Sequence, residues 1–267
     1  MREGETMHSA IAPIARLGAA VSRLVLELGR VARFGAVACV ALLRPPYRLR
    51  RLSHELFDTG VLSLPIVCAS GLTVGLVLGL QLYWVLVRFG SESSLGSVVG
   101  LTLIRELGPV MTGLLVTGRA GSAMAAEIGV MRATEQLDGM RTLAMDPLHY
   151  VVGPKLLAML LAMPLLASLF ILFSIFGAWL VGVQLLGLDH GVYLAGLEQS
   201  ISFRTDILGS LIKDVVFAAI IALVATYRGF TSGQSAAGVG RATTGTVVTA
   251  SVCILLADYI VTALWGF

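Results

Sequence analysis

Two long stretches without a single charged residue constrain the fold of this chain more than any other feature. They run from Thr59 to Val87 and from Leu156 to Leu188. A helix needs roughly 20 apolar residues to cross a hydrocarbon core of about 30 Å. Only 13% of the chain is charged, whereas an ordinary soluble domain has about 25%. The sequence therefore predicts an all-α membrane protein.

Three further apolar segments are interrupted by a few charges but are long enough to cross a membrane. Together with the two uncharged stretches they predict five transmembrane helices, at about 59–87, 98–128, 156–188, 207–227 and 243–264. We expect residues 52–267 to form one five-span domain. Residues 1–51 precede it as a separate segment.

The N-terminal segment is basic, with nine arginines in residues 1–51. From Ile14 to Leu43 it is apolar except for one narrow face, which carries Arg16, Arg23, Glu27 and Arg30. Such a pattern is typical of an amphipathic helix lying in the membrane interface. A sixth crossing is the alternative, but it would place these charges near the middle of the membrane. Binding to anionic lipid explains the arginines more simply than binding to nucleic acid.

The positive charges also predict the orientation, because cytoplasmic segments are enriched in lysine and arginine. With the N-terminus in the cytoplasm, the inner segments hold the nine N-terminal arginines plus Arg132, Arg141, Lys155, Arg228 and Arg241. The outer segments hold only Arg88 and Arg204. Five spans then place the C-terminus in the periplasm, with Trp265 at the interface.

Seven charged residues lie within the predicted spans, where an unpaired charge is costly. Asp258 lies near the end of the fifth span, and the six candidate site residues are Arg105, Glu106, Arg119, Glu127, Lys213 and Asp214. At about 100° per residue, Arg105, Arg119 and Glu127 fall within roughly 80° on the second span. One interpretation is an interhelical ion-pair network; the other is a polar lining beside a translocation path. The two are compatible.

Glycines recur at every fourth residue of the first span, at Gly71, Gly75 and Gly79. This spacing places them on one helix face, where the absence of side chains allows another helix to approach closely. We interpret this face as a helix-packing surface.

The sequence contains no nucleotide-hydrolysing motif. A phosphate-binding loop needs a lysine after its glycines, and the only lysines are Lys155 and Lys213. The three cysteines are isolated, and the histidines lie in loops or near helix ends, so we expect no metal site and no catalytic residues. We infer that this chain is not an enzyme and binds no cofactor itself.

Between the second and third spans, residues 131–145 form a short amphipathic stretch that ends at Asp146-Pro147. Leu137, Met140 and Ala144 recur at helical spacing, and proline ends helices before it. The stretch is predicted to be a helix that lies on the membrane or docks into a groove of a cytoplasmic partner.

Five sequence blocks resemble motifs of one family, the MlaE (YrbE) permeases of bacterial ATP-binding-cassette lipid transporters. The blocks are residues 105–109 (RELGP), 118–123 (GRAGSA), 126–129 (AEIG), 131–138 (MRATEQLD) and 238–244 (GVGRATT). They occur in the family's order. The resemblance covers roughly residues 45–267 and depends on the blocks taken together.

The resemblance implies an assembly in the bacterial inner membrane. It implies a homodimer with a lipid cavity between the copies, a cytoplasmic ATPase pair that carries ATP and Mg, a periplasmic ring of MCE-domain proteins and a small cytoplasmic STAS-type subunit. The substrate would be phospholipid, moved between inner and outer membranes to maintain outer-membrane asymmetry. The ATPase would dock on the helix at 131–145, for which the candidate residues are Thr134, Glu135, Gln136, Asp138 and Met140.

Two positions depart from the family pattern. Ala237 replaces a usually acidic residue, and Gly245 replaces a commonly basic one. Contacts of those side chains with an ATPase are not expected in this chain.

Two other functions compete with the lipid permease. The paired charges of the spans would also suit a stand-alone secondary transporter or channel for a small solute, although such proteins often contain internal repeats and the five spans show none. A membrane scaffold that transports nothing is the third possibility.

Overall fold

The computed structural model describes residues 22, 25–40 and 49–265, and this part of the chain is helical without strands. Five helical units are long and apolar enough to cross a membrane. This confirms the predicted number of spans. The five units are Leu49–Val87, Glu92–Ala133, Leu148–Leu185, Phe203–Phe230 and Ala236–Trp265.

Several spans consist of consecutive helical segments, with π-helical turns in the second, third and fourth. The first contains α2 (Leu49–Thr59), the 3₁₀ turn η1 (Val61–Ser63) and α3 (Leu64–Val87). The second contains η2 (Glu92–Ser94), α4 (Leu95–Thr102), η3 (Leu103–Leu107), α5 (Gly108–Val116), η4 (Thr117–Gly121) and α6 (Ser122–Ala133). The third contains η5 (Leu148–Val152), α8 (Gly153–Trp179) and η6 (Leu180–Leu185). The fourth contains η7 (Phe203–Ile207) and α10 (Leu208–Phe230), and the fifth is α11 (Ala236–Trp265).

The first span begins earlier than expected. The amphipathic helix α2 continues into η1 and α3, since Gly60 N donates to Leu56 O. The predicted boundary between residues 51 and 52 therefore falls inside a helix, and the predicted start at residue 59 is one residue before Gly60. The sequence did not indicate this continuity, because α2 has a polar face and the span that follows is apolar.

The predicted helix at 131–145 is divided in the structure. Its first residues belong to α6, and only α7 (Gln136–Thr142) forms a separate helix. The break lies at Glu135, which has a left-handed backbone with φ of 58°, and Ala144 adopts φ of 56° after the helix. Helical spacing of apolar residues did not reveal these two turns.

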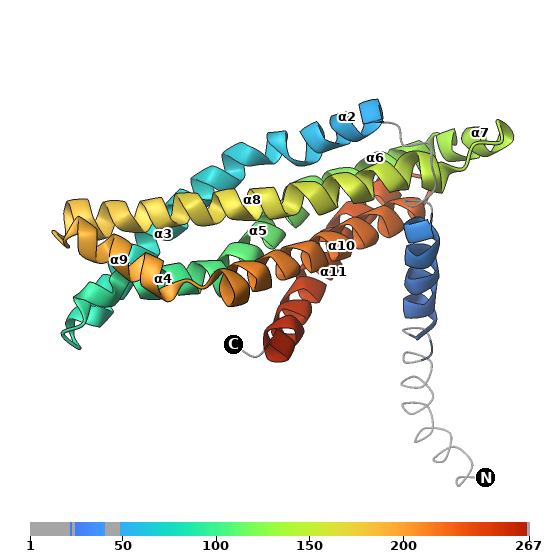
Figure 1. Ribbon diagram of the computed structural model, residues 1–267. Coiled ribbons are helices and arrows are strands. Elements are labelled where there is room, and N and C mark those ends of the chain that lie inside the picture. The colour runs from blue at the N-terminus through green and yellow to red at the C-terminus, as the bar shows by residue number, and fades with distance from the viewer. Residues whose placement is uncertain (1–21, 23–24, 41–48, 266–267) are drawn as a thin grey trace, which may run out of the picture.

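A helix that the sequence analysis did not predict connects the third and fourth spans. This helix, α9 (His190–Ser200), begins at Asp189, whose side chain accepts from Val192 N at 3.0 Å. Figure 1 shows α9 at the end of the bundle opposite α7. We call these the α9 end and the α7 end. Which side of the membrane each end faces stays a prediction.

The first and third spans are in close contact along α3 and α8. Gly71, Gly75 and Gly79 are all buried, and a Cβ at Gly75 would overlap the backbone of Ser174. In return, Ser174 Oγ donates to Gly71 O at 2.8 Å. The glycine face is therefore a site of close helix approach.

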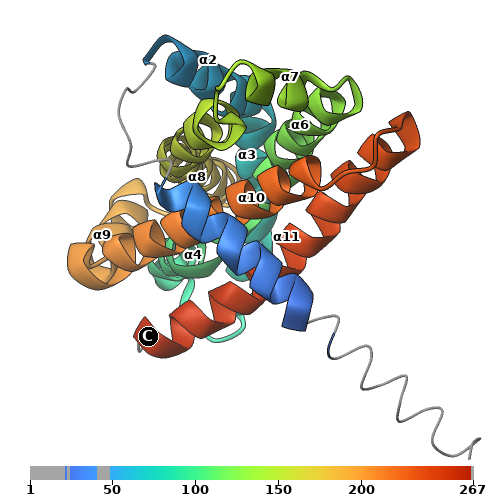
Figure 2. The same cartoon turned by 90° about the vertical axis from the view of Figure 1, so that its right-hand side faces the viewer.

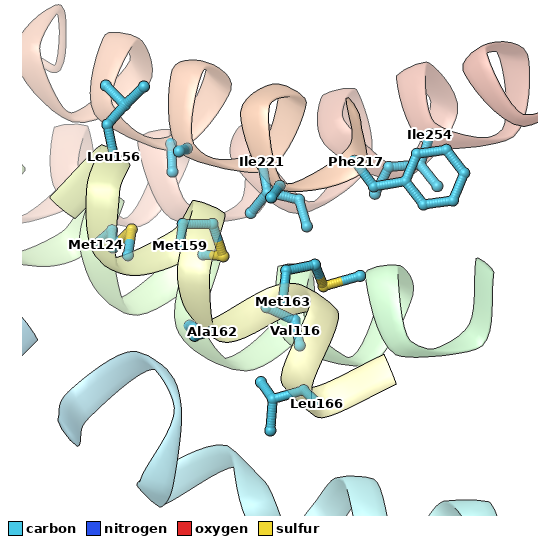
Figure 3. Packing of buried hydrophobic residues seen from close by; sticks show 14 of the residues in the cluster. Val116, Met124, Leu156, Met159, Ala162, Met163, Leu166, Phe217, Ile221 and Ile254 are labelled. Carbon is cyan, nitrogen blue, oxygen red and sulfur yellow. The ribbon is translucent and has the colours of Figure 1, made fainter. Parts of the chain in front are cut away.

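The main apolar core lies where α6, α8 and α10 meet (Figure 3). Met159 and Met163 of α8 lie beside Ile221 and Phe217 of α10, all fully buried. By contrast, α11 is the least buried span: only 11% of its apolar stretch is buried by the rest of the chain that the structure describes. Its exposed apolar residues are available to lipid or to another subunit.

Residues 25–40 form a helix that crosses α10 (Figure 2). Phe34 contacts the rings of Tyr227 and Phe230, with centroids 5.6 and 5.8 Å away. Glu27 and Arg30 are exposed, whereas Arg16 and Arg23 lie outside the described residues. Location of this helix in the membrane interface stays a prediction.

Because α3 and α8 approach closely at Gly75, we predict that Gly75→Ala lowers the free energy of unfolding by about 1–3 kcal/mol, since the added methyl overlaps backbone atoms. Thermal unfolding in detergent micelles measures the loss. Gly118→Ala is the matched control, since nothing lies within 4 Å of a Cβ there. Equal melting temperatures for both variants would contradict the close contact of α3 and α8.

Candidate functional site

A fully buried lysine joins three spans. Lys213 of α10 lies 2.8 Å from Glu106 Oε2 of η3 and 3.0 Å from Asp258 Oδ1 of α11. We call these three residues the Lys213 cluster. Thr262 Oγ1 also donates to Glu106 Oε1 at 3.3 Å. The cluster attaches α11 to the second and fourth spans.

The backbone of the second span explains why the lysine lies there. Pro109 has no N–H and cannot donate to the carbonyl of Arg105 four residues earlier. Lys213 Nζ donates to that carbonyl instead, at 2.7 Å. A carbonyl without a donor costs several kcal/mol in a membrane. Lys213 therefore stabilises both the two carboxylates and the backbone carbonyl of Arg105.

The side chain of Arg105 points to another partner. Its Nε and Nη2 each lie 2.8 Å from Asp206 Oδ1 in η7. Asp206 is buried, and its other oxygen accepts from Ser202 N at 2.7 Å. This contact anchors the start of the fourth span against the second.

A second buried lysine lies toward the α7 end. Lys155 Nζ is 2.7 Å from Glu55 Oε2 and 2.5 Å from Glu127 Oε2. Arg51 stacks over the ring of Tyr150, its Cζ 4.3 Å from the centroid. Lys155 thereby joins the first three spans beside an open cleft of about 690 Å³.

Arg119 stabilises the junction of α2 and α3. It donates to the carbonyl of Asp58 and to Ser63 Oγ, the latter at 3.2 Å. Asp58 also lies 2.9 Å from His54 Nδ1. The arginine satisfies a carbonyl at the end of α2, just before the 3₁₀ turn η1.

The charged residues of the second span therefore have partners in different helices. Arg105, Glu106 and Lys213 gather in one region, whereas Arg119 and Glu127 have partners in the first and third spans. The π turns η3 and η4 depart from the 100° per residue that the calculation assumed. Asp214 is buried beside Lys213, and its Oδ1 has no hydrogen-bond partner among the described residues.

Sequence reasoning missed four partners of these charges as site residues: Glu55, Lys155, Asp206 and Asp258. Three lie near predicted span ends, where a charge is ordinary. The sequence did carry one signal for these residues: each charge within a span needs an opposite charge nearby.

The predicted docking residues lie at the α7 end. Glu135, Gln136 and Asp138 are exposed, and Asp138 pairs with Arg141 at 2.8 Å. Thr134 Oγ1 donates to Val130 O at 2.9 Å. The opposite face of α7 is fixed, since Leu137 is buried against Ile128 and Val151, with Met140 alongside.

This fold and these charge clusters define a polytopic helical membrane protein whose spans are joined by buried ion pairs and which presents a short polar helix at one end. Residues 52–264 match the model of the family described as Permease MlaE. The chain belongs to the MlaE permease family, which confirms the resemblance.

Curated relatives extend over nearly the whole chain. A protein of Haemophilus influenzae named intermembrane phospholipid transport system permease protein MlaE is 44% identical, with 94% of this chain and 96% of the relative covered. A probable ABC transporter permease protein of Rickettsia bellii is 40% identical, with 93% and 96% covered. The chloroplastic protein TRIGALACTOSYLDIACYLGLYCEROL 1 of Arabidopsis thaliana is 32% identical, with 83% and 63% covered.

The Lys213 cluster predicts that Lys213→Met lowers stability by about 3 kcal/mol, because two carboxylates lose a shared buried partner. The triple variant that adds Glu106→Gln and Asp258→Asn should recover much of the loss. Unfolding in detergent micelles measures both. A single variant as stable as the parent, or a triple variant no better than the single, would contradict this account.

Proposed function

We propose that this chain is the permease subunit of an ATP-binding-cassette transporter that moves phospholipid between the inner and outer membranes of a bacterium. The supporting observation is its 44% identity, over nearly the full length, to a permease named for intermembrane phospholipid transport. The five apolar spans suit a multi-pass protein of the inner membrane. Maintenance of outer-membrane lipid asymmetry is the role that the proposal assigns to this movement.

The proposal places ATP hydrolysis on a separate cytoplasmic subunit pair, which binds ATP and Mg. The α7 end is then the cytoplasmic end, in agreement with its arginines and lysine. The docking helix is α7, with contacts from Thr134, Glu135, Gln136, Asp138 and Met140. Its exposed carboxylates suit a basic or hydrogen-bonding groove on the partner.

Contacts at the base of α7 explain how docking would affect the spans. Leu137 packs against Ile128 of α6 and Val151 of η5. Arg132, at the end of α6, donates to Phe230 O at the end of α10. A displacement of α7 is therefore passed to the second, third and fourth spans together.

A second copy of the chain completes the proposed pathway. The fifth span exposes a row of apolar residues on α11, among them Val248, Val252 and Leu255. In the proposed homodimer a lipid cavity lies between the copies, and Arg105, Glu106 and Lys213 support the wall behind it. A periplasmic MCE-domain ring receives or delivers the lipid, and a small STAS-type subunit accompanies the ATPase.

The alternative, a stand-alone secondary transporter, is motivated by the buried Lys213 cluster. Reconstitution separates the two functions. Lipid transfer that requires both ATP and the ATPase subunit supports the permease. Gradient-driven solute flux by the chain alone would support the alternative.

The docking assignment predicts that Glu135→Gln with Asp138→Asn reduces ATP-driven phospholipid transfer about tenfold or more in reconstituted complexes. Loss of two charge-assisted contacts to the ATPase is the reason. Glutamine retains the side-chain size at Glu135, whose positive φ makes other changes harder to interpret.

The matched control is Glu92→Gln with Glu198→Gln, which removes two exposed carboxylates at the α9 end. It should leave ATPase-dependent transfer unchanged. Parental transfer by the double variant in α7 would refute docking through these carboxylates.

A further inference from the structure

A hydrogen bond between two side chains closes the loop that joins the third span to α9. Trp179, the last residue of α8, donates from Nε1 to Nδ1 of His190, the first residue of α9, at 2.8 Å. The chain between them contains the π turn η6 and Gly187, whose φ is 77°. The contact therefore fixes the start of α9 relative to the end of α8.

This hydrogen bond can form in one direction only. The indole nitrogen of tryptophan is a donor and has no lone pair to offer. His190 must therefore accept, and the accepting nitrogen must carry no proton. A neutral imidazole has such a nitrogen, whereas an imidazolium has a proton on both nitrogens and accepts nothing. The hydrogen bond exists only while His190 is neutral.

The two partners differ in their contact with solvent. Trp179 is partly buried, and its ring stacks on that of Phe176 with the centroids 5.7 Å apart. It also packs against the buried cluster that contains Leu95 and Tyr193. His190 is exposed, and its ring meets the indole at 81°. The histidine can therefore exchange protons with water while the indole stays in place.

The charged and titratable groups around His190 are few. Asp189 precedes it, and its carboxylate accepts from a backbone N–H of α9 at 3.0 Å. The elements packed against α9 are α4, which has no charged residue, and η2, which contributes Glu92. Glu198 and Tyr193 belong to α9 itself. His190 forms no ion pair with any residue that the structure describes.

The field at the start of α9 does not prevent a proton from binding. A helix N-terminus carries partial positive charge, which opposes a cation on the first residue. The carboxylate of Asp189 lies at this terminus and offsets that charge. Water also solvates the exposed imidazolium, so His190 remains free to titrate.

The rest of α9 is fixed by packing that does not depend on protonation. A Cβ at Gly96 of α4 would overlap Tyr193 O, and a Cβ at Gly196 would lie 3.3 Å from Ser97 N. These close contacts hold α9 against the second span. Loss of the contact with Trp179 therefore frees the loop before α9 and leaves the helix attached to α4.

We propose that the hydrogen bond between Trp179 and His190 is an acid-sensitive latch. The latch is closed while His190 is neutral. A proton on Nδ1 places two N–H donors against each other, so the hydrogen bond is lost and the imidazolium turns to water. In the orientation proposed above the latch faces the periplasm and responds to pH on that side of the membrane. The latch itself depends neither on that orientation nor on what the permease moves.

The test follows the indole N–H resonance of Trp179 by NMR of the full-length chain in detergent micelles, assigned with Trp179→Phe. We expect the resonance to move from a hydrogen-bonded to a free position, as one proton binds, between about pH 8 and pH 5. In His190→Asn the side-chain oxygen takes the place of Nδ1 and accepts at every pH. The resonance of this variant should stay at the hydrogen-bonded position throughout.

The matched control is His54→Asn, which removes an exposed histidine from α2 at the α7 end. It should leave the titration of the Trp179 resonance unchanged. A resonance that does not move with pH in the parent, or one that still titrates in His190→Asn, would overturn the latch.

Hydrogen exchange measures the opening of the loop. Leu188 N donates to Gly182 O at 3.0 Å within it. After correction for the intrinsic effect of pH, exchange at Leu188 should rise about fivefold on acidification, the factor that corresponds to one lost hydrogen bond. Exchange at Ser91, whose N–H donates to Leu86 O in the loop between the first two spans, should not change. An equal rise at both amides would show general loosening and contradict a local latch.

Discussion

The rest of this structure depends on the cost of leaving a charge or a backbone carbonyl unpaired in a low-dielectric interior. Lys213 meets that cost for two carboxylates, and it also donates to the carbonyl of Arg105, to which Pro109 cannot donate. If any one of these groups is removed, the remaining groups lose a polar partner. The positions of α10 and α11 relative to the second span are therefore set by chemistry at one point, where apolar packing alone would allow the helices to slide.

The same requirement repeats toward the other end, where Lys155 pairs with Glu55 and Glu127. The two lysines of the chain thus each join three spans, and they act at different depths. Apolar contacts fill the space between them, with the methionines of α8 against α10. Ion pairs fix which helices are neighbours, and the apolar core fixes how closely they approach.

The number of spans and the glycine face could be predicted from the sequence because each depends on local composition or on simple periodicity. Gly75 needed only its spacing from Gly71 and Gly79. The partners of the charges could not be predicted in this way, since Asp206 becomes buried only through the π turn η7 and its contact with Arg105. The break before α7 depends on the backbone of a single residue, Glu135, whose side chain gives no sign of a positive φ. The role of α7 in docking stays a prediction.

Close contact of α3 and α8 has a mechanical consequence. With the backbone of Ser174 seated against glycine and a hydrogen bond across the seam, neither helix can slide or rotate without separating from the other. The first and third spans therefore form one rigid unit, and a displacement that reaches either of them must be shared by both.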